Sequence, residues 1–292
     1  LRNLKKVYRG LEDEDRMVGL FNHCIFDLES RAPSIDTPLH GLLPFPHIDH
    51  LHPDALIAIA ASKEGEKITK EIWGETMGWV DWQRPGFDLG LQLEKCLLEN
   101  PSIRGIVLGS HGLFTWGQTS LECYLNSLDV IEQASSYITE KIKKNGSVFG
   151  GEKRSALEPK KRKQKAADLM PLLRSLCSSE QMMIGHFSDA PEVLEFVNSN
   201  DLEHLAPMGT SCPDHFLRTK IKPLILPLNA DIEIKDHEEL KKRIEAEFEA
   251  YRKDYKAYYN QCKKDNSPAL RDPNPVILLF PGVGLFSFAK NK

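Results

Sequence analysis

Two stretches decide the fold: HIDHLHPDALIAIA at residues 47–60 and IRGIVLGSHGLFTWG at residues 103–117. The apolar run Ile103–Leu108 is typical of a buried strand, and beyond a glycine-flanked turn the chain continues as a second strand. The apolar segment that begins at Asp54 predicts a helix capped by that carboxylate. Because strands and helices alternate, we predict a layered α/β domain over residues 1–145.

Three histidines in these stretches indicate a metal site. His50 and His52 are separated by one residue, and on a strand such side chains point to the same face. His111 lies between small residues at the end of the predicted buried strand, where a side chain faces a cleft. Histidine is the commonest metal ligand, and three protein ligands leave the open position that a catalytic zinc needs. Partly exposed or structural histidines are the alternative.

The loop PSIDTPLH at residues 33–40 supplies a carboxylate. Two prolines bracket Asp36, which suits a functional carboxylate beside a surface cleft. The alternative is a helix or turn cap, a place where Asp is common. Ser34 stands two residues before Asp36 and can donate a hydroxyl to an anion, and His40 stands four residues after it, where it can orient the carboxylate.

The chain changes character after residue 145. Residues 146–181 are interpreted as a basic linker followed by a helix, and the run Lys160–Lys165 (KKRKQK) as a solvated part of that linker. A nucleic-acid or targeting patch is the alternative for this run. Residues 182–292 predict a second, smaller α/β region, with one of its strands at Lys222–Leu228.

The second region contains a faint echo of the first. The string HGLFTWG at residues 111–117 aligns with VGLFSFA at residues 283–289, and each follows a strand that itself follows a helix. The histidine of the first string is Val283 in the second. Two interpretations stay open, a degenerate half-copy without metal and a chance recurrence of strand-glycine-aromatic patterns.

Composition excludes several classes of protein. Of 292 residues, 41% are hydrophobic and 27% charged, which is ordinary for a globular protein. The net charge of −4 argues against a nucleic-acid partner, and no apolar run is long enough for a membrane span or a secretory signal. The six cysteines are scattered without a CxxC pair, which favours free thiols in a reducing compartment. We therefore expect a cytoplasmic protein.

Taken together, these residues resemble the class II aldolase/adducin family, in which a carboxylate loop, an HxH pair and a histidine-glycine at a strand end follow in this order. Here His111 stands 59 positions after His52. The strings HIDHLHPDALIAIA, WQRPGFDLG, CPDHFLRTK and DPNPVILLFPGVGLFSF are similar to the aldolase portion of the bifunctional rhamnulose-1-phosphate aldolase/lactaldehyde dehydrogenase group. This similarity spans both regions of the chain.

The resemblance implies a three-layer α/β/α domain with zinc held by His50, His52 and His111. It implies that Asp36 is the catalytic acid/base, where relatives usually have Glu, and that Ser34 contacts the substrate phosphate. The implied reaction is cleavage of a ketose 1-phosphate to dihydroxyacetone phosphate and a small aldehyde. A small-molecule sugar phosphate is then the expected partner, and a homo-oligomer the expected assembly.

Two departures from the family pattern leave alternatives open. Residues 1–32 lack the glycine- and asparagine-containing phosphate loop that precedes the carboxylate in relatives, which favours an adducin-like binding module without catalysis. The chain also shows no GxGxxG unit, so we expect no dehydrogenase activity from it. A sugar-phosphate epimerase of the same family, which uses the same zinc and bond chemistry, is a further alternative.

Overall fold

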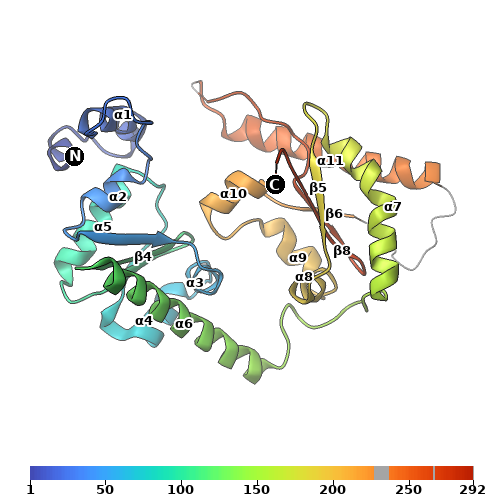
Figure 1. Cartoon of the computed structure of the whole chain (residues 1–292), viewed down its shortest axis with the longest axis horizontal. Coiled ribbons are helices and arrows are strands. Elements are labelled where there is room, and N and C mark those ends of the chain that lie inside the picture. The colour runs from blue at the N-terminus through green and yellow to red at the C-terminus, as the bar shows by residue number, and fades with distance from the viewer. Residues whose placement is uncertain (227–236, 266, 292) are drawn as a thin grey trace. The chain divides into compact units, whose positions relative to one another are not determined.

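The computed structural model describes residues 1–226, 237–265 and 267–291, which form two compact units (Figure 1). Unit 1 comprises Leu1–Lys144 with Ser211–Pro213, and unit 2 comprises Asn145–Thr210 with Asp214–Lys292. Each unit is built around one four-stranded mixed sheet. Among the described residues, no helix has both the length and the apolar character needed to cross a membrane.

Unit 1 surrounds a sheet of strand order β1-β4-β3-β2. Its strands are β1 (His47–Leu51), β2 (Gly78–Val80), β3 (Gly105–Leu108) and β4 (Gly112–Gly117). Its α-helices are α1 (Glu14–Leu20), α2 (Thr37–Gly41), α3 (Asp54–Ala60), α4 (Gly65–Trp73), α5 (Phe87–Glu99) and α6 (Ser120–Asn145). Short 3-10 turns lie at Arg2–Lys6, Leu11–Asp13, Phe21–Cys24 and Gly74–Thr76.

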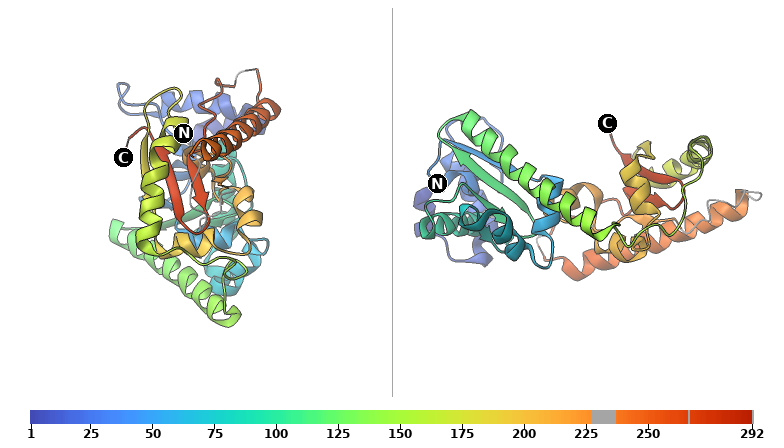
Figure 2. Two further views of the ribbon diagram at one scale, coloured as in Figure 1. Left: turned by 90° about the vertical axis from the view of Figure 1, so that its right-hand side faces the viewer. Right: turned by 90° about the horizontal axis from the view of Figure 1, so that it is seen from below.

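Helices cover both faces of this sheet because β3 is apolar at every position. Ile106 and Leu108 point to one face and pack with side chains of α2 and α5. Val107 points to the other face and packs with α3, α4 and α6. The long helix α6 runs across that second face in the right-hand view of Figure 2. The three-layer α/β/α arrangement expected for this region is confirmed.

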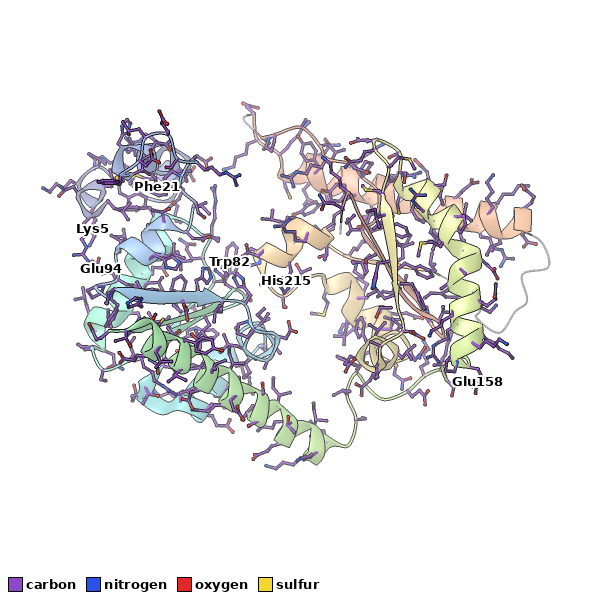
Figure 3. The ribbon with its side chains drawn as sticks, in the orientation of Figure 1. Lys5, Phe21, Trp82, Glu94, Glu158 and His215 are labelled. Carbon is purple, nitrogen blue, oxygen red and sulfur yellow. The ribbon has the colours of Figure 1, made fainter. Side chains whose placement is uncertain are left out.

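The N-terminal segment packs against the outer side of α5. Met17 and Phe21 are completely buried with Phe87, the first residue of α5. Lys5 pairs with Glu94 on the same helix, and Figure 3 labels both residues beside Phe21. This contact anchors the segment that leads into the Asp36 loop.

The prediction that Asp54 caps the helix after β1 is wrong. The cap of α3 is Pro53, in extended conformation, and Asp54 is the first helical residue. No side chain forms a capping hydrogen bond there. Proline is suited to the position between β1 and α3 for two reasons. Its fixed φ fits the residue just before a helix, and it has no backbone N–H that needs a hydrogen-bond partner.

Unit 2 surrounds a sheet of strand order β5-β8-β7-β6. Its strands are β5 (Ile184–Ser188), β6 (Leu224–Ile225), β7 (Ile277–Phe280) and β8 (Gly284–Ala289). Its helices are α7 (Pro159–Cys177), α8 (Pro191–Val197), α9 (Leu202–Leu205), α10 (Pro213–Thr219) and α11 (His237–Cys262), with a 3-10 turn at Ala206–Met208. Figure 2 shows α7 and α11 beside the strands of this sheet.

Two predictions for this region need correction. The basic run Lys160–Lys165 lies in the opening turns of α7, just after Glu158, which Figure 3 labels, so it is helical and not part of a linker. The strand predicted at Lys222–Leu228 is observed only as β6, and residues 227–228 lie outside the described residues.

The two sheets have the same topology. In unit 1, β4 pairs antiparallel with β1 and β3, and β2 pairs parallel with β3. In unit 2, β8 pairs antiparallel with β5 and β7, and β6 pairs parallel with β7. The helix between the two parallel strands, α5 or α11, packs on the same relative face in both units.

Candidate active site and metal centre

The three histidines gather at one edge of the unit 1 sheet. His50 lies on β1 and His52 directly follows it, while His111 lies in the turn between β3 and β4. Strands β1 and β3 both run antiparallel to β4, so their carboxyl ends reach the same edge. Residues 59 positions apart in sequence therefore meet because of strand pairing.

The β3–β4 turn is shaped to hold His111. Ser110 has a positive φ of 51°, and its N–H donates to the carbonyl of Ala60 at 2.9 Å. The next N–H, that of His111, closes the turn on the carbonyl of Leu108 at 3.1 Å. Gly112 follows because a Cβ at this position would lie 2.6 Å from a His52 ring carbon.

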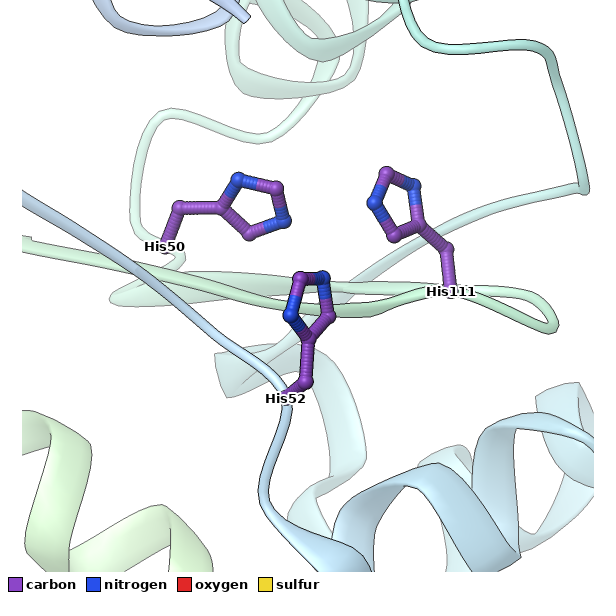
Figure 4. Close-up of side chains that lie close together, drawn as sticks. All are labelled: His50, His52 and His111. Carbon is purple, nitrogen blue, oxygen red and sulfur yellow. The ribbon is translucent and has the colours of Figure 1, made fainter. Parts of the chain in front are cut away.

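The imidazoles point toward one another (Figure 4). One ligand atom from each of His50, His52 and His111 lies within 4.8 Å of the others. The ring centroid of His50 lies 4.7 Å from that of His52 and 5.0 Å from that of His111. This is the only such group among the described residues, and it can hold a metal ion.

The electrostatics of this three-histidine cluster suit a cation. Burial, and then the neighbouring His111 and His52, lower the pKa of His50 to about 2, so its ring is neutral and its nitrogens can bind a metal. Nε2 of His50 is buried with no hydrogen-bond partner among the described residues. A buried, unsatisfied nitrogen is costly unless a ligand binds it, so these residues fit zinc.

The Asp36 loop lies beside the cluster. One cavity of about 750 Å³ is lined by Ser34, Asp36, His40 and His50. The Ser34 hydroxyl donates to Asp36 Oδ2 at 3.2 Å and accepts the Asp36 N–H at 3.2 Å. Asp36 also precedes α2, but its side chain makes no capping hydrogen bond. The carboxylate therefore does not cap the helix, and it lies in the lining of the cavity.

His40 is a member of the site that the sequence only hinted at. Its ring lies 6.3 Å from that of His50 and 5.4 Å from that of Phe114, between the cluster and the Asp36 loop. Burial lowers the pKa of His40, although the charge of Asp36 opposes this shift. The signal in the sequence was the four-residue spacing from Asp36, which places both on one side of α2.

Two other polar residues near the site-forming segments have partners elsewhere. Asp49, which precedes His50 on β1, accepts a hydrogen bond from Ser127 of α6 at 2.9 Å on the opposite face of the sheet. Arg84 is exposed and pairs with Asp15 at 2.6 Å. Cys212 of unit 1 and His215 of unit 2 join no metal-ligating group among the described residues.

Comparison with known families agrees with this geometry. Residues 6–138 match the model of the class II aldolase and adducin N-terminal domain, and residues 164–292 match that of the class II aldolase second domain. The chain belongs to the class II aldolase and adducin family. The first match lies within unit 1. Apart from Ser211–Pro213, the second lies within unit 2, which it covers from residue 164 to its end.

Individual relatives are more distant. The chain is 36% identical over 285 residues to an uncharacterized oxidoreductase, YuxG, of Bacillus subtilis (strain 168). This match covers 98% of the chain but only 41% of that protein. A class II aldolase domain from Thermoplasma acidophilum is 27% identical, with a TM-score of 0.42 over 47% of this chain and 62% of that one. A sugar-phosphate aldolase from Thermotoga maritima is 18% identical, with a TM-score of 0.32 over 40% and 57% of the two chains.

Proposed function

We propose that this class II aldolase family member is a zinc-dependent lyase that cleaves a ketose 1-phosphate to dihydroxyacetone phosphate and a small aldehyde. One observation carries the proposal: the cavity that Ser34, Asp36 and His40 line reaches His50 of the three-histidine cluster. An acid/base group, a hydroxyl donor and a metal site thus border one space large enough for a phosphorylated sugar.

Each group has a chemical task in this proposal. Zinc in the cluster supplies a Lewis acid that stabilises the negative charge developing on the substrate oxygens. Asp36 removes a proton from the substrate hydroxyl and returns one to carbon after the carbon–carbon bond has broken. Ser34 turns its hydroxyl from Asp36 Oδ2 to the phosphate when substrate binds, while the Asp36 N–H still donates to Ser34 Oγ and keeps the loop oriented.

The substrate is proposed to be similar to rhamnulose 1-phosphate, with lactaldehyde as the aldehyde. This rests on the strings along both regions that resemble the aldolase portion of the bifunctional rhamnulose-1-phosphate group. The chain spans less than half the length of the Bacillus relative. The proposed substrate and products are therefore a proposal for this chain, and the activity of that longer protein is not carried over to it.

Assembly and location are further proposals. The helix α6 exposes a run of large apolar side chains, Leu121, Tyr124, Leu125 and Leu128, each more than 40% accessible. Such a stripe is a natural contact between identical copies, and light scattering would show whether Leu125→Arg reduces the mass of a homo-oligomer. The free cysteines fit a cytoplasmic location.

Elemental analysis of purified protein tests the metal site first. We expect about one zinc per chain in the parent and none in His111→Ala, since three ligands are needed to hold the ion. The matched control is His47→Ala, which removes an exposed histidine at the start of the same strand and should leave the metal in place. Cleavage of ketose 1-phosphates is then assayed with all three proteins.

The outcomes separate the competing functions. Zinc with release of dihydroxyacetone phosphate supports the aldolase. Zinc with interconversion of sugar phosphate epimers, and no cleavage products, would replace the aldolase by an epimerase. If the parent protein binds no zinc even when zinc is added, both the aldolase and the epimerase are excluded, and a binding module of the same fold remains.

A further inference from the structure

The site of unit 1 has a structural counterpart in unit 2. His50 of β1 is registered against Phe114 of β4, and Phe187 of β5 is registered against Phe286 of β8. The aromatic rings contact in both cases, with centroids 4.3 Å and 5.2 Å apart. Position 187 is therefore the counterpart of the first histidine ligand.

The connecting turns also correspond. The N–H of Val283 donates to the carbonyl of Phe280 at 3.0 Å, as the N–H of His111 does to that of Leu108. A Cβ on Gly284 would lie 2.4 Å from the carbonyl of Ser188, as one on Gly112 would lie 2.6 Å from that of Leu51. Repeated steric details of this kind support a divergent half-copy over a chance recurrence.

The copy has lost the ligands. The counterparts of His50, His52 and His111 are Phe187, Asp189 and Val283 by strand register. Asp189 is held in an ion pair with Arg162 at 3.0 Å, where both side chains are largely buried, and Val283 is fully buried. Neither contributes a second metal site.

The copy has nevertheless kept a cavity at this edge of its sheet. It has a volume of about 480 Å³ and is lined by the residues after the parallel strands β6 and β7, Leu226 and Pro281. In open α/β sheets, ligands bind outside the carboxyl ends of the strands. The cavity thus lies beyond the strand ends that correspond in unit 1 to the end of β3, next to His111.

The polar lining of this cavity is suited to an anion. Lys153 pairs with Glu203 at 3.3 Å, so these two charges offset each other. Arg154 is exposed, and its guanidinium has no partner among the described residues. One net positive charge therefore lines the cavity, which favours a ligand that carries a single anionic group.

Asn198 adds an amide donor to the same cavity. The residue is only 5% exposed, and its Oδ1 accepts the N–H of Gly282 at 2.6 Å. Its Nδ2 makes no hydrogen bond with the described residues and is not fully buried, so it is accessible from the cavity that the residue lines. An acceptor in the cavity can therefore take a hydrogen bond from this amide.

We propose that unit 2 is a degenerate copy of the catalytic unit whose cavity binds a small organic anion, a carboxylate or phosphate group on a short carbon chain, through Arg154 and Asn198. The anionic group meets the guanidinium and the amide. The carbon chain contacts the apolar part of the lining, which includes Val197, Leu202 and Ile225. No metal takes part.

The test follows the Asn198 side-chain amide by NMR in the full chain labelled with 15N-asparagine, with the signal assigned from an Asn198→Ala sample. L-lactate and glycerol 3-phosphate are the carboxylate and phosphate probes. We expect one of them to shift this signal saturably. Arg154→Gln should weaken the apparent affinity by about tenfold or more, because one charge-assisted hydrogen bond is lost, and Arg154→Lys should weaken it less. Arg154 is exposed, so neither change removes core packing.

A matched control and the contrary results complete the design. Lys241→Gln, which removes an exposed charge of α11 outside the cavity, should leave the titration unchanged. The proposal is overturned if neither probe moves the Asn198 signal, or if Arg154→Gln and Lys241→Gln titrate like the parent. Because every residue that lines this cavity belongs to unit 2, failure here would leave the aldolase proposal untouched.

Discussion

At the scale of single residues, the site depends on side chains whose surroundings keep them ready for a ligand. His50 is neutral because burial opposes its protonation, and its Nε2 lacks a hydrogen bond among the described residues. Asp36 lies at the start of α2 without capping it, and it lines the cavity that reaches His50. The proposed function gives these two groups different tasks, proton transfer to Asp36 and metal binding to His50.

Replacing Asp36 tests the division between these tasks. We expect Asp36→Asn to keep its zinc but to lower kcat by roughly 10² to 10⁴, the usual contribution of an acid/base group. Metal analysis and steady-state cleavage assays measure the two effects. Ser34→Ala is the companion variant and should mainly raise KM. Full cleavage by Asp36→Asn would show that another group moves the proton.

The cysteines provide a second test at this scale. Cys24 and Cys262 are exposed, whereas Cys123 and Cys177 are buried. Burial raises the pKa of Cys177 to about 12 and that of Cys123 to about 11, so neither forms the reactive thiolate near pH 8. An aromatic disulfide reagent should therefore label Cys24 and Cys262 rapidly in the native protein, and Cys123 and Cys177 only after unfolding. Rapid native labelling of Cys177 would contradict this.

At the scale of elements, the termini and turns of unit 1 are held by contacts from distant parts of the chain. The carboxylate of Glu14 on α1 is buried and accepts the N–H groups of Phe87 and Asp88 at 2.8 Å each, which caps α5 from outside that helix. Gly86 precedes the cap because a Cβ there would lie 2.2 Å from Glu14 Oε2. The start of α5 therefore depends on the N-terminal segment.

Removing this carboxylate should destabilise unit 1. We expect Glu14→Ala to lower the free energy of unfolding by about 2 kcal/mol. The N–H groups of Phe87 and Asp88 at the start of α5 both lose their acceptor, and that of Phe87 is buried. Urea unfolding followed by circular dichroism measures the change. Glu12→Ala, at an exposed position just before α1, is the control and should change stability by less than about 0.5 kcal/mol. Equal effects of the two changes would disprove the capping role.

The β3–β4 turn gives a second test at this scale. We expect Gly112→Ala to weaken zinc binding by about tenfold or more, because the added Cβ displaces the His52 ring that lies 2.6 Å away. Competition with a chromophoric chelator measures the affinity. Gly19→Ala, in α1 with nothing within 4 Å of the new Cβ, should leave zinc binding unchanged and slightly stabilise the helix. Unaltered zinc affinity in Gly112→Ala would show that the turn can relax.

At the scale of the whole molecule, two units share one topology but differ at the corresponding edge. Three histidines gather there in unit 1, and Phe187, Asp189 and Val283 take their places in unit 2. Among the described residues, only unit 1 is therefore equipped to hold zinc, although a cavity also lies at the strand ends of unit 2.

Zinc titration of metal-free protein should accordingly saturate at about one ion per chain. In scanning calorimetry, saturating zinc should raise the melting temperature of unit 1, since a ligand at 100 times its Kd stabilises the folded state by about 2.7 kcal/mol. A second transition, from unit 2, should not move. Saturation at two ions per chain, or equal shifts of both transitions, would contradict the loss of ligands in unit 2.

Local sequence patterns predicted the elements that carry the site. Ile103–Leu108 and the following glycine-flanked histidine anticipated β3, its turn and β4, because a buried strand and a tight turn are local features. The basic run Lys160–Lys165 was misjudged because a solvated helix and a solvated linker have the same composition. The placement of His40 needed the structure, since a four-residue spacing from Asp36 shows proximity on a helix but not the cavity that both line.

The sequence by itself determined the alternation of strands and helices and the two same-face histidines at the end of β1, because these depend on the periods of strand and helix. Only the tertiary structure decided that His111 meets them, since this requires β1 and β3 to pair on either side of β4. It alone showed the cap from Glu14 to α5 and the shared topology of the two sheets. Such contacts join distant residues, and their register is set by packing and hydrogen bonding between elements rather than by the pattern within any one of them.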